Sequence, residues 1–317
     1  MNSSKTPAPS TTHQADANHL RDVKLSFIGC GVMAEAIIAG LLRQQLITPA
    51  QVTGSHPRAN RRRELESKYG VRLVESNREA ATATNLADDA DDLKGNGAGA
   101  SAGEHRAPQR SSSIVVLSVK PQRLNVVLSE LRGAVASEQL VLSIIAGARI
   151  ETIANQLSHP AIVRAMPNTP AQVGQGMTVW TATPEVSDRQ QREVGAMLGA
   201  LGKELRVEEE RMIDMATALS ATGPTYIFMM MEALVDAGVH MGFSRHVAQE
   251  LVLQTMLGSV VFAQESHKHP AELRNMVTSP GGTSAEAIYQ MEKGSLRTVF
   301  SKAVWAAYQR AIALGQR

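Results

Sequence analysis

The sequence has little of several residue types that mark particular classes of protein. Its 317 residues include one cysteine, Cys30, which excludes an internal disulfide framework and is typical of a reducing compartment. Aromatic residues make up 3% of the chain, so stacking platforms for nucleic-acid bases are scarce. The formal net charge of +2 gives no strongly basic surface. We therefore expect no nucleic-acid partner.

Long apolar runs are missing as well. No run reaches the roughly 20 residues that a membrane-spanning helix needs. The first twenty residues are polar and lack the apolar segment of a secretory signal, so we interpret residues 1–22 as a disordered tail. We expect a cytoplasmic protein with no membrane partner. The chain is 43% hydrophobic and 20% charged, which predicts a globular protein with a sizeable core and room for two domains.

Short apolar runs alternate with helical stretches over residues 23–208. The runs are Leu25–Ile28, Val52–Ser55, Ile114–Val119, Leu140–Ile145, Ile162–Met166 and Met177–Trp180. Strands that alternate with helices indicate an α/β fold with a mostly parallel, doubly wound sheet. Residues 88–113 interrupt this rhythm and contain almost no apolar side chains, so we interpret them as a flexible surface insertion.

The pattern becomes all-helical over residues 209–317. Tyr226–Val239 is apolar nearly all round, and much of Leu251–Ala263 also lacks a polar face. Such helices must be buried in a large core or at an oligomer interface, and about a hundred residues cannot easily bury both. This region is therefore predicted to be an α-helical domain through which two copies form a homodimer. Its methionine cluster is typical of core packing, and nothing in the sequence suggests a metal site.

The most informative motif joins the first strand to the first helix. Phe27-Ile28 runs into Gly29-Cys30-Gly31-Val32-Met33-Ala34, a Gly-x-Gly-x-x-Ala fingerprint, and then into a helical pattern. Gly29 permits the tight turn, Gly31 lets a pyrophosphate approach the backbone, and Ala34 lets the helix pack closely. The helix N-terminus attracts the phosphates. Residues 23–208 are thus predicted to form a Rossmann-type dinucleotide-binding domain.

The end of the second strand indicates which dinucleotide is preferred. An NAD site normally has Asp or Glu here for the ribose hydroxyl, but this chain has Ser55, His56 and Arg58. An arginine can hold a 2′-phosphate through paired hydrogen bonds, so NADPH is favoured, with NADH possible but less preferred. We interpret the following Arg61–Arg63 as a solvated helix face.

Three further segments have candidate functional residues. Lys120 follows the apolar run Ile114–Val119, at the strand end where parallel sheets bind ligands. Ala146 and Gly147 follow the next strand and leave room for a flat ring. The loop Ser279-Pro280-Gly281-Gly282-Thr283-Ser284 precedes a helix, with Thr283 or Ser284 where an N-cap belongs. Such a loop can bind a carboxylate or simply cap the helix.

Taken together, these segments make the chain resemble pyrroline-5-carboxylate reductase, the last enzyme of proline biosynthesis. The matching stretches are spread from Lys24 to Gly315 in the family's order. They are Phe27–Ala34, Val119-Lys120-Pro121-Gln122, Arg164-Ala165-Met166-Pro167-Asn168-Thr169-Pro170, Leu219–Tyr226, and His269–Leu273 leading to Ser279–Ser284.

The resemblance implies NADPH-dependent reduction of (S)-1-pyrroline-5-carboxylate to L-proline by a homodimer that can join into a larger ring. It implies cofactor contacts at Gly29, Cys30, Gly31, Val32, Met33, Ser55, His56, Arg58, Asn77, Ser118, Val119, Lys120, Ala146, Gly147 and Asn168. It implies substrate contacts at Glu210, Thr217, Thr222, Ser279, Gly281, Gly282, Thr283 and Ser284, within a helical substrate and dimerisation domain.

The candidate catalytic residues are Ser284, Thr283 and Lys120. We expect Ser284 to hydrogen-bond the ring nitrogen, whose protonation makes the C=N carbon electrophilic. The sequence departs from the family at Val32, often Asn, at Ala221-Thr222, usually Gly-Ser, and at Ser284, usually Thr. Two alternatives stay open at this point: a 3-hydroxyacid dehydrogenase-like oxidoreductase, disfavoured because residues 212–242 contain no lysine, and a non-catalytic NADPH-binding regulatory protein.

Overall fold

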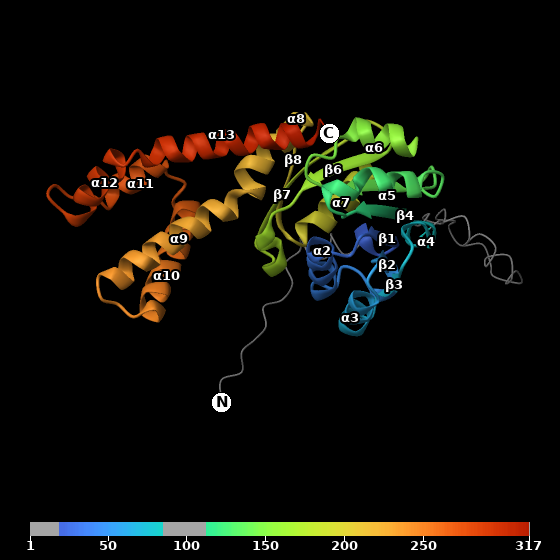
Figure 1. Ribbon diagram of the computed structural model, residues 1–317, viewed down its shortest axis with the longest axis horizontal. Helices are drawn as coiled ribbons and strands as arrows, with labels where there is room; N and C mark the ends of the chain where they lie inside the picture. The colour runs from blue at the N-terminus through green and yellow to red at the C-terminus, as the bar shows by residue number, and fades with distance from the viewer. Residues whose placement is uncertain (1–18, 85–111, 317) are drawn as a thin grey trace, which may run out of the picture. The chain divides into compact units, whose positions relative to one another are not determined.

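The fold is seen in a computed structural model, which describes residues 19–84 and 112–316. The chain divides into two compact units (Figure 1). The sheet unit runs to Ala221 and takes in the end of the chain from Arg310 on, and the helical unit is Thr222–Gln309. The domain boundary predicted between residues 208 and 209 stays a prediction.

The sheet unit is built on eight strands in the order β3-β2-β1-β4-β5-β6-β7-β8. The strands are β1 (Val23–Ile28), β2 (Val52–Ser55), β3 (Arg72–Val74), β4 (Ser112–Leu117), β5 (Leu140–Ser143), β6 (Ile162–Met166), β7 (Gly176–Ala182) and β8 (Gly202–Arg206). All neighbouring pairs are parallel except β6 and β7. The expected doubly wound, mostly parallel sheet is confirmed. The short edge strands β3 and β8 were not predicted.

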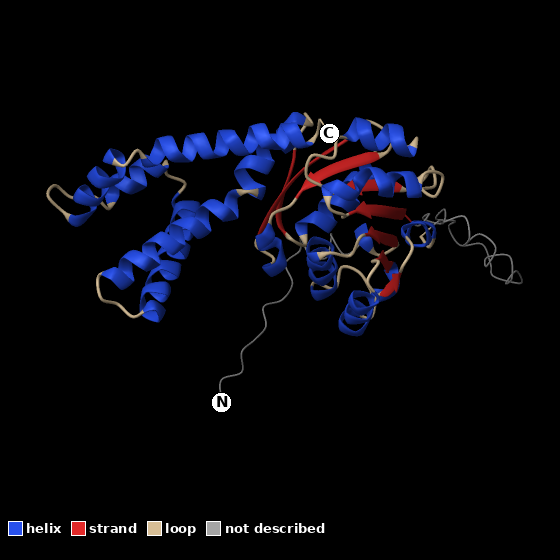
Figure 2. Ribbon diagram, in the orientation of Figure 1, coloured by secondary structure: helices blue, strands red, loops and turns tan. Residues whose placement is uncertain are grey.

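Helices cover both faces of this sheet (Figure 2). One face packs against α2 (Val32–Arg43), α3 (Ala59–Tyr69) and α7 (Asp188–Gly199), and the other against α4 (Asn77–Thr82), α5 (Leu124–Leu131) and α6 (Ile150–Leu157). Buried side chains on the first face include Phe27 and Ile37, and those on the second include Val115 and Leu128. Strands buried on both faces explain the continuous apolar runs in the sequence.

The order in which strands are added to the sheet reverses between β1 and β4. After β1 it builds β2 and β3 on one side, then crosses back to place β4 on the other side of β1. In open α/β sheets ligands bind outside the carboxyl ends of the strands at such a switch point. Gly29 follows β1 and Ser118 follows β4, so the glycine turn lies at this point.

Two boundaries of the predicted flexible segments are wrong. Leu20, assigned to the disordered tail, is fully buried in the core, and its carbonyl oxygen accepts a 2.8 Å hydrogen bond from Gln51 Nε2. Ser112 and Ser113, assigned to the insertion, begin β4 and are buried. Their polar side chains suggested a loop, but Ser112 Oγ bonds Glu193 and Ser113 Oγ accepts from Gln139 Nε2. The rest of the insertion, from 88 to 111, and the tail up to residue 18 lie outside the described residues.

A short helix and a π-helical turn complete the sheet unit before the helical unit begins. They are α8 (Arg211–Ala216), which lies beside β6 and β7, and the turn Thr217–Ala221. The helical unit comprises α9 (Gly223–His240), α10 (Arg245–Ser266), α11 (Pro270–Met276), α12 (Thr283–Lys293) and most of α13 (Leu296–Leu314). The α9 and α10 helices pack closely at Gly238, where a Cβ would lie 2.9 Å from Ala248 Cβ.

Candidate functional site

The glycine turn after β1 has the geometry that the fingerprint predicts. Gly29 adopts φ +89°, and a Cβ there would lie 2.5 Å from Val119 Cγ1. Gly31 is the N-cap of α2, and nothing lies within 4 Å of where its Cβ would be. The first N–H groups of α2, beginning at Val32, have no partner within the helix. The turn therefore offers open space in front of backbone donors, which is what a diphosphate requires.

A relay of polar side chains fixes this turn. The Gly29 N–H donates to Ser55 Oγ (3.1 Å), Ser55 Oγ donates to Asn77 Oδ1 (2.6 Å), and Asn77 Nδ2 donates to Glu130 Oε2 (2.6 Å). On the other side, Ser118 Oγ donates to the Gly29 carbonyl oxygen (2.9 Å). The structure thus joins Gly29, Ser55, Asn77 and Ser118, which the sequence predicted as separate cofactor contacts.

Cys30 lies beneath the turn and is chemically quiet. Its side chain is fully buried, and a Cβ on Gly54 would lie 2.3 Å from its sulfur. Burial raises the pKa of the Cys30 thiol to about 12. The thiol therefore stays protonated at neutral pH, and its part in the site is packing.

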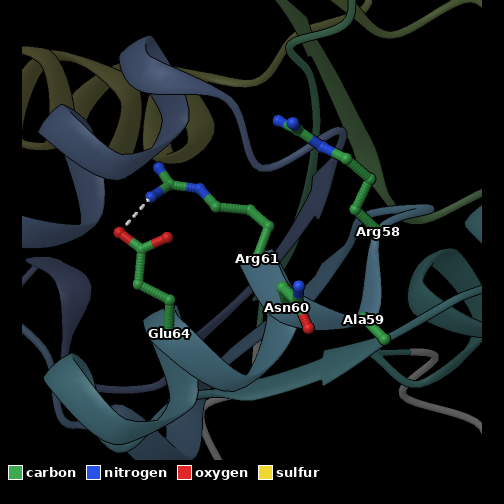
Figure 3. A pocket seen from close by; sticks show the side chains of 5 residues that line it. All are labelled: Arg58, Ala59, Asn60, Arg61 and Glu64. Atoms are coloured by element: carbon green, nitrogen blue, oxygen red, sulfur yellow. Dashed lines mark hydrogen bonds and ion pairs between the residues drawn. The ribbon is translucent and has the colours of Figure 1, made fainter.

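The end of β2 leads into a pocket lined by two arginines. Arg58, Ala59, Asn60, Arg61 and Glu64 surround a cavity of about 490 Å³ (Figure 3). The Arg58 and Arg61 side chains extend to the same side from the start of α3, and Arg61 bonds Glu64 at 2.7 Å. A cavity with cationic groups suits a phosphate.

His56 borders this region as a neutral group. Its Nδ1 accepts a hydrogen bond from the Arg58 N–H at 3.2 Å. Burial, together with the nearby charges of Arg58, Arg61 and Arg62, lowers the pKa of His56. The positive charge at this strand end is therefore supplied by the arginines.

The expectation that Arg61–Arg63 form a solvated helix face is wrong for Arg61 and Arg62. Their side chains are only 16% and 18% exposed. Arg61 pairs with Glu35 of α2, and Arg62 donates to the His56 carbonyl oxygen at 2.7 Å. The first turn of α3 lies against α2 and against the loop that follows β2. A run of three arginines in the sequence gives no sign of this packing. Arg63 is exposed.

Glu35 is the anion at the centre of this packing. It also accepts from Lys68 Nζ (2.9 Å) and Tyr69 Oη (2.8 Å). Burial disfavours its charge, but the hydrogen bonds from Lys68, Arg61 and Tyr69 outweigh burial and lower the pKa of Glu35 to about 2. Sequence reasoning missed Glu35, although an acid in the first turn of α2 is one available signal.

The loops after β4 and β5 follow the same edge of the sheet as the glycine turn. Val119 is half-buried against Gly29, and Lys120 is exposed. Gly147 has φ +75°, and a Cβ there would lie 2.7 Å from Leu314 Cβ. A glycine at this place is thus required by the close approach of the end of α13 as well as by the turn.

Asn168, after β6, is fixed by two hydrogen bonds. Its Oδ1 accepts from the Met177 N–H at 2.9 Å, and its Nδ2 donates to the Ser220 carbonyl oxygen at 3.3 Å. Ser220 lies in the π-helical turn that begins at Thr217, whose Oγ1 donates to the Ile213 carbonyl oxygen at 2.7 Å. Such π-helical turns are frequent at functional sites.

Glu210 caps one helix and precedes another. Its Oε1 accepts from the Ile150 N–H at the start of α6 (2.9 Å) and from Arg164 Nη1 (2.8 Å). Arg164 Nη2 donates in turn to Asp214 (2.6 Å). Sequence reasoning assigned Glu210 to the substrate and missed its partners, although an arginine inside the apolar run Ile162–Met166 was a signal.

In the helical unit, the loop before α12 is a tight turn. The Gly282 N–H donates to the Ser279 carbonyl oxygen at 3.0 Å, and Gly281 has φ +69°. The N-cap of α12 is Gly282, which has no side chain to cap with, so the expectation that Thr283 or Ser284 is the N-cap is wrong. The two-glycine turn enters the helix one residue earlier than the sequence suggested. Thr283 and Ser284 therefore occupy the first helical turn, with Thr283 exposed and Ser284 half-buried.

Thr222 is the N-cap of α9, and its carbonyl oxygen accepts from the Thr225 N–H at 2.9 Å.

Within residues 19–84 and 112–316, no group of three or more His, Cys, Asp or Glu side chains could hold a metal ion. No helix over the same ranges is long and apolar enough to cross a membrane.

A glycine turn at the switch point of a doubly wound sheet, with an open N-terminus of α2 and an arginine-lined pocket after β2, defines a dinucleotide-dependent oxidoreductase of the Rossmann class. Two family models match the chain in agreement with this class. Residues 24–147 match NADP oxidoreductase, coenzyme F420-dependent, and residues 210–314 match pyrroline-5-carboxylate reductase dimerisation.

Relatives cover nearly the whole chain. The pyrroline-5-carboxylate reductases of Synechocystis sp. and Pseudomonas aeruginosa are each 38% identical to this chain. Each alignment covers 93% of this chain, together with 99% of the Synechocystis protein and 97% of the Pseudomonas protein. The crystal structure of Plasmodium falciparum pyrroline carboxylate reductase with NADP bound is similar at a TM-score of 0.76 and 29% identity, over 92% of this chain and 98% of that one. The chain belongs to the pyrroline-5-carboxylate reductase family.

Proposed function

We propose that this protein reduces (S)-1-pyrroline-5-carboxylate to L-proline with NADPH, the final step of proline biosynthesis. The observation that carries the proposal is the glycine turn, open at Gly31 and clamped by Ser55 and Ser118, in a chain of this family. The 3-hydroxyacid dehydrogenase-like alternative has no comparable support.

The residues of the sheet unit fit a dinucleotide. The N–H groups at the start of α2 would hold the diphosphate, and Arg58 beside Ser55 and His56 would hold the 2′-phosphate. The fit is supported by the open space at Gly31 and by the cavity beside Arg58. Bound NADPH supplies the hydride that reduces the imine carbon. Further cofactor contacts are assigned to Val32, Met33, Asn77, Ser118, Val119, Lys120, Ala146, Gly147 and Asn168, but not to Cys30, which is fully buried beneath the turn.

The loop before α12 is assigned to the substrate. The N–H groups around Gly281–Thr283 would bind the carboxylate, since a helix N-terminus favours an anion. Ser284 would donate to, or relay a proton to, the ring nitrogen, and Thr283 and Lys120 are secondary candidates. Support comes from the N-cap of α12: Gly282 occupies that position, so the Ser284 hydroxyl is not used for capping. Glu210, Thr217, Thr222 and Ser279 complete the assigned substrate contacts.

The assembly is proposed to be a homodimer formed through the helical unit, able to join into a larger ring. Support comes from the match of residues 210–314 to the dimerisation model and from apolar side chains such as Phe228, 59% exposed in the single chain. We further propose a cytoplasmic location and no membrane or nucleic-acid partner, in line with the composition and the single cysteine.

The test is turnover of synthetic pyrroline-5-carboxylate, with NADPH and NADH run side by side. We expect proline as the product and a higher kcat/KM for NADPH. Binding of NADPH without turnover would instead support the regulatory protein that the sequence left open. Turnover of a 3-hydroxyacid but not of the imine would support the other alternative.

A further inference from the structure

Arg164 is the bulkiest of the fully buried side chains in the described part of the chain, and the proposed reaction gives it no role. It lies in β6, in an otherwise apolar run, on the face shared with Ile162 because strand side chains alternate. A buried guanidinium loses its hydration and is stable only where anions replace the water. Its surroundings therefore indicate what it is for.

Two carboxylates from α8 and the residue before it supply that replacement. Arg164 Nη1 donates to Glu210 Oε1 (2.8 Å), and Nη2 donates to Asp214 Oδ1 (2.6 Å). The two anions outnumber the one cation. Asp214 is nearly as buried as Arg164, whereas the Glu210 side chain is 32% exposed. Asp214 anchors the arginine, and Glu210 is the member of the trio that reaches the surface.

Glu210 is held through one oxygen only. Its Oε1 accepts both Arg164 Nη1 and the Ile150 N–H, the first N–H of α6. The second oxygen, Oε2, has no hydrogen bond to any described residue. Two donors on one oxygen fix the plane of the carboxylate and leave the other oxygen available at the partly exposed side.

The same bonds tie together three segments of the candidate site. The α6 helix follows the Ala146–Gly147 loop, β6 leads to Asn168, and α8 leads to the turn that begins at Thr217. Asn168 closes the circuit through its bond to the Ser220 carbonyl oxygen. Apolar side chains of similar volume can often replace a buried ion pair with no loss of stability. Stability alone therefore does not explain why these bonds join three segments of the candidate site.

We infer that Arg164 is a positioning residue that orients the Glu210 carboxylate for the substrate and locks α6 and α8 around it. The inference rests on the proposed function. It deepens that function by assigning a role to a side chain that touches neither cofactor nor substrate.

The test compares Arg164→Lys with Arg189→Lys. A lysine keeps the charge at position 164 but offers one point donor instead of a planar fork, so it cannot serve both carboxylates in the same geometry. Arg189 of α7 is the matched control, because it also pairs with a buried carboxylate, Glu193, at 2.8 Å, and that carboxylate bonds Ser112 at the start of β4. Melting temperature, NADPH affinity and steady-state rates are measured on each variant.

We expect Arg164→Lys to raise KM for the imine about tenfold, the effect of losing one charge-assisted hydrogen bond, with NADPH affinity within about twofold of wild type. Arg189→Lys should lower the melting temperature without raising KM. An equal rise in KM for both variants, or an unchanged KM in a folded Arg164→Lys protein, would overturn the inference.

A double variant separates positioning from general loosening. If Arg164 acts through Glu210, adding Arg164→Lys to Glu210→Gln should raise KM by less than about twofold beyond Glu210→Gln alone. Independent, multiplying effects would overturn the inference. Should Arg164→Lys not fold, Glu210→Gln alone decides, because an unchanged KM would show that no residue can act through Glu210. Failure of the proposed function is seen separately, as absent turnover by the wild-type protein.

Discussion

The sheet unit and the helical unit differ in where their apolar side chains lie. Nearly all buried apolar residues belong to the sheet unit, on the two faces of its sheet. In the helical unit only a few described residues, such as Val235 and Ala248, are buried, and large side chains such as Met229 (65%) and Leu257 (59%) are exposed. The sheet unit completes its own core, whereas the helical unit leaves an apolar surface of the kind that oligomer interfaces cover.

The two units also differ in how their candidate sites are built. The candidate cofactor residues Gly29, Ser55, Asn77 and Ser118 of the sheet unit are joined by hydrogen bonds between the ends of β1, β2 and β4 and the start of α4. The loop before α12 is fixed mainly by its own turn and its two glycines. We therefore expect changes at Ser55, Arg58 and the glycine turn to affect NADPH, and changes in the loop before α12 to affect the imine, which can be tested separately.

The largest effect is expected from a charge placed on the exposed apolar surface of the helical unit. Met229→Asp places a carboxylate on the exposed apolar face of α9. Burying this charge against a second copy without a partner would carry a large desolvation free energy, so the interface should not form. The variant should be aggregated or unfolded in size-exclusion chromatography and circular dichroism. Val126→Asp is the control, since Val126 is 46% exposed on α5 of the sheet unit and should leave assembly unchanged. A folded, active monomer from Met229→Asp would show that the helical unit does not need another copy to cover its apolar surface.

Ser284 tests the helical unit's part in the chemistry. Ser284→Ala should lower turnover about 10–1000-fold, the range for one positioned donor or proton relay, and leave NADPH affinity nearly unchanged. Ser284→Thr should retain activity because the hydroxyl remains. Since Gly282 is the N-cap, the melting temperature of the Ala variant should change little. A lowered melting temperature with normal turnover would make Ser284 a structural residue instead.

Arg58 tests the sheet unit in the same way. Arg58→Asp removes a cation and adds repulsion beside the 2′-phosphate, so NADPH should bind about ten- to a hundredfold more weakly, while NADH is little affected. Arg63→Asp in α3, the helix that follows Arg58, is the matched control, because Arg63 is exposed and bonds Asn60 at 2.9 Å. Equal weakening of both cofactors in a titration would contradict the assignment of Arg58.

The smallest effect is expected from acid acting on Glu35. Its pKa is lowered from 4.5 to about 2, so its ion pairs stabilise the folded state above about pH 4.5, and this contribution is lost as the pH falls toward 2. A shift of this size corresponds to at most about 3 kcal/mol, less the screening of the exposed Lys68. Glu35→Gln should therefore be less stable than wild type at pH 7, and the difference should shrink by pH 3. Urea titrations at both values measure it, and a pH-independent difference would contradict this account.

Much of the sheet and of the cofactor turn could be predicted from local pattern. The run Ile162–Met166 has the bounds of β6, and the Gly29–Ala34 fingerprint is seen as a turn at the start of α2. These features depend on residues close together in the chain, where backbone freedom, side-chain alternation and helix periodicity leave few choices. The edge strand β8 (Gly202–Arg206) was missed because its exposed polar residues have no apolar pattern.

The sequence by itself determined the class of fold, the family and which residues are candidates for the site. Only the tertiary structure decided how they are held: Arg61 by Glu35 of another helix, Gly29 by Ser55 and Asn77, and Glu210 by a buried Arg164. It also decided that Gly282, not Thr283 or Ser284, caps α12. The physical reason is distance along the chain. Arg164 and Glu210 are separated by 46 residues, and their meeting depends on how β6 and α8 pack, which no local pattern encodes.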